Sequence, residues 1–276
     1  MSKNFELLQQ AELNSGPTPP AGAPHTHTTG SAPRPTSAPR VAPLRPASNY
    51  VGSGLRRGSG ASDRMDLDRL TEEESLRLVQ SLFLGNVADA PRVVMFAGVD
   101  SGNGCSHVCA QAAESLANNV RGSVCLVDGN LRTPTLPEYF GVTNHHGLTD
   151  SLRNSGAIRE FAKKLLPENL WLLSCGSLAG DSSTLINSGL MKERINELRQ
   201  EFDYVLIDSP PLNAYSDGVV LGQLSDGLVL VLEANATRRE AALKITDGLR
   251  SAKIKILGAV LNKRTFPIPD YWYHKL

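Results

Sequence analysis

A glycine-rich stretch, Gly98-Val-Asp-Ser-Gly-Asn-Gly-Cys-Ser-His107, has most of the residue types of a phosphate-binding loop. In such a loop, glycines turn consecutive backbone N–H groups toward phosphates, a lysine pairs with the outer phosphates and a hydroxyl ligates Mg²⁺. Gly102, Gly104 and Ser106 occupy three of these places, but Cys105 stands at the lysine position. A strand-to-helix turn without a ligand has a similar sequence. The candidate nucleotide-binding residues of the loop are Gly102, Asn103, Gly104, Cys105, Ser106 and His107.

Two further segments each end an apolar run in an acid: CLVDGNLRTP (125–134) and FDYVLIDSPPL (202–212). Asp208 has the layout of a Walker B carboxylate, which binds Mg²⁺ directly or through water. Asp128 can hold a Mg²⁺-bound water or accept a proton from a hydroxyl, and Arg132 can meet a phosphate. An ordinary helix cap or turn also explains Asp128. The segments predict catalytic roles for Asp128, Arg132 and Asp208, and Mg²⁺ ligation by Ser106, Asp128 and Asp208.

The elements that must position these residues alternate along the chain. Short apolar runs predict strands at residues 92–98, 123–129, 169–176, 204–210, 227–234 and 255–262. Amphipathic patterns between them predict helices at 106–119, 184–202, 218–224 and 238–252. Continuous apolar strands separated by amphipathic helices are typical of a parallel sheet covered on both faces. We therefore predict a doubly wound α/β fold with a mainly parallel sheet and helices on both faces.

In such sheets, ligands bind at the carboxyl ends of the strands. Four of these ends carry Gly-rich backbone, a carboxylate or a carboxamide. They are the loop at 98–106, Asp128, Asp208 and Asn262-Lys-Arg264. We expect these residues to lie together, and as a set they are more specific than any one motif.

The segments that flank the domain have a different composition. Residues 1–64 are rich in Pro, Gly, Ser, Thr and Ala, which predicts a disordered arm, with a short amphipathic segment at residues 4–13. The arm carries seven Lys or Arg against three Asp or Glu, so it can meet an anionic membrane or an acidic partner. A solvated linker explains it as well. Nothing resembles the basic stripe of a nucleic-acid-binding protein.

After the arm, residues 71–86 predict an amphipathic helix, with Thr71 and Glu74 as a capping box at its start. The chain then divides into the arm (1–64), the segment that contains this helix (65–90), a folded domain (91–265) and a tail (266–276). Neither a signal peptide nor an apolar run of about 18 residues is evident, which predicts a cytoplasmic protein without a membrane span. The four cysteines are expected to be reduced, and small buried side chains explain them better than a metal site.

The chain resembles the cytoplasmic kinase domain of the bacterial tyrosine kinases, the capsular exopolysaccharide family. The resemblance rests on an ordered series of segments: FAGVDSGNGCS, VCLVDGNLRTPTLPEYFG, GLTDSL, NLWLLSCG, FDYVLIDSPPL, SDG and GAVLNKR. It runs from about Glu74 to Arg264. Glu74-x-x-Arg77-x-x-Gln80 resembles the E-x-x-R-x-x-R subunit-contact motif of the family, with Gln80 at the place of the last Arg. The family belongs to the MinD/ParA-like, deviant-Walker P-loop ATPases.

The resemblance implies ATP and Mg²⁺ as cofactors and phosphorylation of tyrosines in the C-terminal tail. It also implies ring-like oligomers and a membrane polysaccharide co-polymerase as partner, at the inner membrane. Residues that match family positions are Gly102, Gly104 and Ser106 of Walker A, Asp128 of Walker A′, Asp208 of Walker B, Asn262 at the adenine, Arg132 and Asp217. The implied phospho-acceptors are Tyr271 and Tyr273, and the implied subunit contacts are Glu74 and Arg77.

The departures from the family pattern concern catalysis. Cys105 replaces the lysine, Asn130 stands where a second acid is usual, and the tail has only Tyr271 and Tyr273, which aromatic anchoring of the C-terminus also explains. Loss of one preorganised donor slows a step by about 10²–10³, so we expect kinase activity to be weak or lost. The alternatives are an inactive pseudokinase that regulates a polysaccharide co-polymerase and a ParA-like spatial-organising ATPase.

Overall fold

The computed structural model describes residues 62–85, 90–177 and 182–264. Apart from residues 62–64, the predicted arm lies outside the described residues, as do its segment at 4–13 and the tail with Tyr271 and Tyr273. The division of the chain into arm, helix, domain and tail therefore stays a prediction. Within the described ranges, no helix combines the length and the apolar character needed to cross a membrane.

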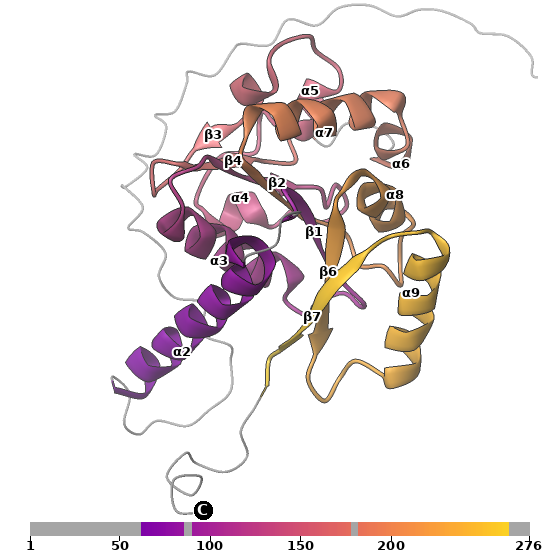
Figure 1. The fold of residues 1–276 in the computed structure, drawn as a ribbon. Helices are drawn as coiled ribbons and strands as arrows, with labels where there is room; N and C mark the ends of the chain where they lie inside the picture. The colour runs from indigo at the N-terminus through magenta and orange to yellow at the C-terminus, as the bar shows by residue number, and fades with distance from the viewer. Residues whose placement is uncertain (1–61, 86–89, 178–181, 265–276) are drawn as a thin grey trace, which may run out of the picture. The chain divides into compact units, whose positions relative to one another are not determined.

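In the described residues, seven strands form one sheet in the order β3-β4-β2-β5-β1-β6-β7 (Figure 1). The strands are β1 (Val93–Gly98), β2 (Val124–Asp128), β3 (Lys163–Lys164), β4 (Leu170–Leu173), β5 (Tyr204–Asp208), β6 (Gly227–Glu233) and β7 (Ile256–Asn262). Neighbours pair in parallel, except that β3 is antiparallel to β4. The six predicted strands are confirmed. The sequence did not predict β3, because its two exposed lysines carry no apolar pattern.

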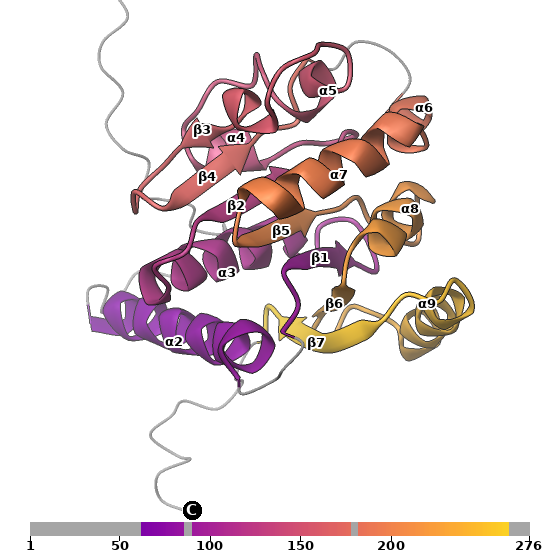
Figure 2. The same cartoon turned by 45° about the horizontal axis from the view of Figure 1, so that its top comes forward.

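Helices cover both faces of the sheet, as predicted (Figure 2). On one face lie α3 (Cys105–Asn119) and α4 (Leu136–Tyr139), with α2 (Ser62–Val79) packed on α3. On the other lie α5 (Leu148–Ser151), α6 (Ser182–Ile186), α7 (Gly189–Glu201), α8 (Asp217–Leu224) and α9 (Arg239–Ser251). A 3₁₀ turn at Ile158–Phe161 precedes β3. The central strand β1 serves both faces, since Val93 and Met95 enter one hydrophobic cluster whereas Val94 and Phe96 enter the other.

The helix before the domain is longer than predicted. It begins at Ser62 and ends in a π-helical turn at Gln80–Leu84. The predicted capping box is wrong, because no Gly or Pro stops the helix between Ser62 and Thr71, which puts Thr71 in its interior. The Glu74 carboxylate instead pairs with Arg77 of the same helix (2.7 Å).

The predicted helix at 184–202 is two helices, α6 and α7. The break occurs because Ser188 caps the second helix, its hydroxyl oxygen accepting a hydrogen bond from the backbone N of Met191 (3.3 Å). The other three predicted helices of the domain are confirmed as α3, α8 and α9.

The carboxylate of Asp226 joins three elements where β6 begins. Its Oδ2 accepts hydrogen bonds from the backbone N of Arg92 and of Val93 (both 2.8 Å), next to the start of β1. Arg199 of α7 donates to both carboxylate oxygens (2.7 and 2.8 Å). Burial opposes ionisation of Asp226, but these donors outweigh it and hold the pKa of Asp226 below its usual range.

We expect Asp226→Ala to lower the free energy of unfolding at pH 7 by about 1–3 kcal/mol, measured by urea denaturation, because charged hydrogen bonds are lost. Since the pKa of Asp226 is lowered in the folded state, its contribution is present above the ordinary Asp pKa of about 4 and is lost as the pH falls through the lowered value. Asp247→Ala, which removes only an exposed pair with Arg250, is the control and loses little stability. Equal losses for the two variants at pH 7 would contradict this role.

Candidate functional site

The predicted site residues meet at the carboxyl edge of the sheet. The loop follows β1, while Asp128, Asp208 and Asn262 are the last residues of β2, β5 and β7. Because β2, β5 and β1 are adjacent, both acids lie next to the loop. Asp128 and Asp208 are direct partners in the register of their two strands. The expectation that these strand ends converge is confirmed.

The loop depends on its two inner glycines. Gly102 and Gly104 adopt left-handed backbone conformations (φ 83° and 81°), which other residues rarely tolerate. Gly104 precedes the first residue of α3, and a Cβ there would collide with the Asn262 amide. Asn103 is buried between them and donates to the Val231 carbonyl of β6 (2.8 Å). The backbone of the loop is thus fixed at the amino end of a 15-residue helix, a position that favours anions.

The two acids are buried but incompletely paired. The Ser106 hydroxyl donates to Asp208 Oδ2 (2.5 Å), and the backbone N of Asn130 donates to Asp128 Oδ1 (3.3 Å). Among the described residues, Asp128 Oδ2 and Asp208 Oδ1 have no hydrogen-bond partner, although neither carboxyl is exposed. Unpaired buried carboxyl oxygens are costly, so they are a reason to expect a ligand here.

Burial raises the pKa of both acids. Desolvation and then the charge of Asp208 raise the pKa of Asp128 well above its usual value. Desolvation raises the pKa of Asp208 to about 6, although the Ser106 and Cys105 side chains favour its ionised form. Carboxylate and hydroxyl oxygens suit Mg²⁺, so Ser106, Asp128 and Asp208 fit this cation. The described residues hold no group of three His, Cys, Asp or Glu that could bind a metal, but Mg²⁺ commonly takes one or two carboxylates plus phosphate oxygens.

Cys105 offers no positive charge to this site. The side chain is buried at the start of α3, beside the Asp208 carboxyl and the backbone of Gly98. Burial raises the pKa of the Cys105 thiol well above its usual value, and the Asp208 charge raises it further. The thiol is therefore neutral at physiological pH. The Cys109 thiol, one turn on, is likewise buried and free.

Arg132, four residues after the end of β2, is held by other side chains. Its Nε donates to Oδ2 of the buried Asp217 (3.1 Å), and its guanidinium stacks 4.8 Å from the centre of the Tyr215 ring. The structure thus brings Arg132 and Asp217 together, while a contact of Arg132 with phosphate stays a prediction. His107, on the first turn of α3, packs edge-on against Tyr139 (5.5 Å between centroids).

The end of β7 closes over the loop. Asn262 Nδ2 donates to the Asn103 carbonyl (2.9 Å), and Lys263 Nζ donates to the Gly102 carbonyl (2.5 Å). The Lys263 ammonium also pairs with Glu233 at the end of β6 (3.2 Å). The adenine contact implied for Asn262 stays a prediction, since its amide is seen here binding the loop.

No family model matches the chain. Its sequence is 30% identical over 227 residues to tyrosine-protein kinase YwqD of Bacillus subtilis, which covers 80% of this chain and 95% of that protein. The chain belongs to the bacterial tyrosine kinase family. The solved kinase domain of VpsO is 27% identical, with a TM-score of 0.67, covering 74% of this chain and 100% of that one. MinD from Pyrococcus horikoshii, solved with Mg-ADP, is 22% identical, with a TM-score of 0.55, covering 67% of this chain and 76% of that one. These likenesses confirm the P-loop NTPase fold.

The sequence did not single out two residues that hold the phosphate-binding loop in place, Asn213 and Lys263. Asn213 lies after β5, where its side chain donates to Asp100 of the loop (3.0 Å) and its backbone N to the Val99 carbonyl (3.0 Å). The only sequence signal for Lys263 is its place directly after Asn262, at a strand end that was expected to lie at the site. The subunit-contact residues Glu74 and Arg77 are exposed on α2, and that role stays a prediction.

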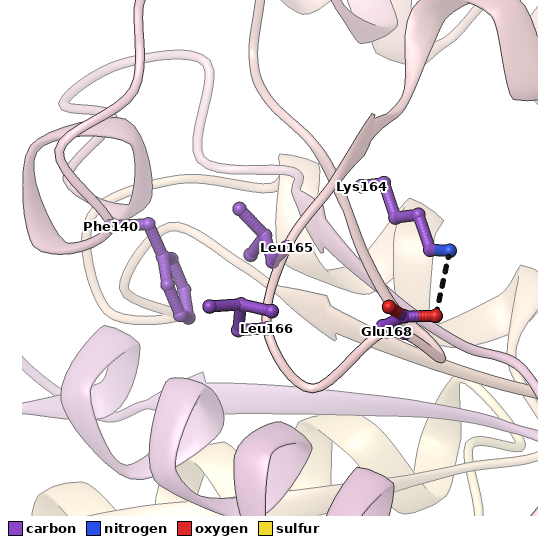
Figure 3. Close-up of a pocket in the computed structure, with 5 residues that line it drawn as sticks. All are labelled: Phe140, Lys164, Leu165, Leu166 and Glu168. Atoms are coloured by element: carbon purple, nitrogen blue, oxygen red, sulfur yellow. Dashed lines mark ion pairs between the residues drawn. The ribbon is translucent and has the colours of Figure 1, made fainter.

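A pocket elsewhere on the domain is not part of this site. Figure 3 shows it lined by Phe140, Lys164, Leu165, Leu166 and Glu168. It surrounds the turn before β4, at the amino end of a strand parallel to β2, whereas the loop lies at the carboxyl ends. Its two charged side chains face each other, Lys164 Nζ lying 3.6 Å from Glu168 Oε2.

We expect protein without Mg²⁺ or nucleotide to lose stability as the pH rises from about 4, the ordinary Asp pKa, through the raised pKa of Asp208, about 6. The reason is that the folded state binds the proton more tightly than the unfolded chain. Asp208→Asn reduces this slope and raises the free energy of unfolding at pH 7.5 by about 1–3 kcal/mol.

The measurement is urea unfolding between pH 5 and 8 in a chelator. Asp100→Asn, which changes a loop acid bonded to Asn213 and leaves Asp208 in place, is the control. A slope that is the same in the Asp208 variant and the unaltered protein would show that this carboxyl does not titrate as stated.

Proposed function

We propose that the protein binds an adenine nucleotide with Mg²⁺ at the loop between β1 and α3, as a bacterial tyrosine kinase whose phosphotransfer is weak or lost. The observation that carries this proposal is the set of unpaired, buried carboxyl oxygens of Asp128 and Asp208 beside the Ser106 hydroxyl. Ser106 is in the first turn of α3, and the backbone N–H groups at this amino end favour phosphate.

The residues of the site have distinct tasks in this proposal. The backbone of Gly102–Ser106 holds the phosphates, and Asn262, beside the loop, lies near the base. Ser106 and Asp208 hold Mg²⁺, which neutralises charge on the phosphates. Asp128 has a raised pKa and a free oxygen, so it suits acceptance of a proton from a hydroxyl.

The neutral Cys105 thiol supports weak or absent transfer. A loop lysine stabilises charge that develops on the outer phosphates during transfer, and a buried thiol has neither the charge nor the reach. Nucleotide binding is less affected, because the backbone amides, Ser106 and Asp208 remain. The same observation favours the second candidate function, an inactive pseudokinase that binds nucleotide and regulates a partner.

Membership of the family supports a biological setting for either version. We infer that the protein acts in capsule or exopolysaccharide production, with a membrane polysaccharide co-polymerase as partner at the inner membrane. Self-association would use the exposed pair of Glu74 and Arg77 on α2. Tyr271 and Tyr273 are the candidate acceptors in the enzyme version.

The test mixes the full chain with labelled ATP and Mg²⁺ and measures both binding and phosphotyrosine. We expect binding in the unaltered protein, and faster transfer in Cys105→Lys by about 10²–10³. Cys105→Ala is the matched control, since it changes the same position without adding charge. Tyr271→Phe/Tyr273→Phe in the Cys105→Lys background abolishes phosphotyrosine.

Binding without transfer in the unaltered protein establishes the pseudokinase version, and transfer there establishes the enzyme version. Absence of nucleotide binding in a folded, unaltered protein would refute both.

A further inference from the structure

A lysine from outside the loop lies against it. Lys263, the residue after β7, donates from Nζ to the Gly102 carbonyl (2.5 Å). Its side chain also passes over Gly104, because a Cβ built on that glycine would lie 3.9 Å from Lys263 Cε. The ammonium group is therefore next to the two glycines that shape the phosphate-binding turn.

The fold holds Lys263 in this place from several directions. Its backbone is left-handed (φ 56°), a conformation that costs a lysine free energy and that persists only where the surrounding structure fixes it. The preceding Asn262 is fixed by its bond to Asn103, and the Lys263 ammonium is held by Glu233 (3.2 Å). The side chain is about half exposed, so a ligand at the loop can reach its ammonium.

Several carboxyl groups lie near the loop, so a cation beside it reduces the repulsion of a bound phosphate. Asp100, Asp208 and Glu233 contact the loop, its helix or Lys263, and Asp128 is the strand partner of Asp208. A triphosphate adds further negative charge. A cysteine side chain has no cationic form, so Cys105 does not offset these charges, and Arg132 is paired with Asp217. Lys263 is already within hydrogen-bond distance of the loop backbone.

We propose that Lys263 supplies the bound phosphates with the positive charge that Cys105 lacks. The proposal rests on the nucleotide-binding function proposed above. When phosphate occupies the loop, the ammonium exchanges its bond with the Gly102 carbonyl for a charge-assisted bond to a phosphate oxygen. Glu233 keeps the side chain directed at the loop.

The test is calorimetric titration of the full chain with Mg-ATP. Lys263→Gln retains an amide that can donate to the Gly102 carbonyl but removes the charge, and we expect it to weaken binding about 10- to 100-fold. Lys263→Arg keeps the charge and stays within a few-fold of the unaltered protein. Lys253→Gln is the matched control, because Lys253 has the same left-handed backbone (φ 60°) but precedes β7 at its other end. Its affinity is unchanged.

The outcomes separate this proposal from the one on which it rests. Binding to the unaltered protein together with equal affinity in Lys263→Gln overturns the role of Lys263 and leaves nucleotide binding intact. Equal weakening in Lys263→Gln and Lys263→Arg also overturns it, since it shows a structural tie rather than a charge. Failure of the unaltered protein to bind Mg-ATP overturns both proposals. Melting temperatures of the ligand-free variants confirm that each is folded.

Discussion

Two carboxyl groups, those of Asp128 and Asp208, are buried side by side where β2 and β5 end. Taking such groups out of water is expensive, and each keeps one oxygen without a partner among the described residues. Apolar side chains on both faces of the sheet hold the strands that carry them. The Ser106 hydroxyl meets one of the acids because α3 begins directly after the loop. We propose that a cation shared by the acids, the hydroxyl and phosphate oxygens accounts for this arrangement.

The loop keeps one of the two properties of a phosphate-binding loop and lacks the other. Its backbone geometry for holding phosphate is intact, with left-handed glycines and a helix amino end. The charge at its lysine position is missing, since Cys105 is a buried neutral thiol. Lys263, the residue after β7, places an ammonium group at the Gly102 carbonyl of the loop. We propose that a cation placed there retains nucleotide but stabilises the transferred group less well, which would leave transfer weak.

The parts of this structure that sequence predicts are those set by periodic patterns. Six apolar runs gave six strands, and the rule that ligands bind at their carboxyl ends brought Asp128, Asp208 and Asn262 to the loop. Contacts set by side-chain reach were not predictable, because no pattern shows that Lys263 turns back to Gly102 or that Arg132 pairs with Asp217. The prediction of a helix start at Thr71 failed because a capping-box pattern can also occur inside a longer helix. This helix begins at Ser62. The two-residue strand β3 exists only through its pairing with β4, and so it leaves no trace in the sequence.

The most direct measurement is a crystal structure of the full chain with Mg²⁺ and a non-hydrolysable ATP analogue. The account predicts the phosphates on the backbone amides of Gly102–Ser106 and Mg²⁺ about 2.1 Å from Ser106 Oγ. It further predicts Asp208 beside the ion, directly or through water, and Lys263 Nζ within hydrogen-bond distance of a phosphate oxygen. A nucleotide bound away from the loop, or phosphates in the loop without Mg²⁺ near Ser106 and Asp208, would contradict it.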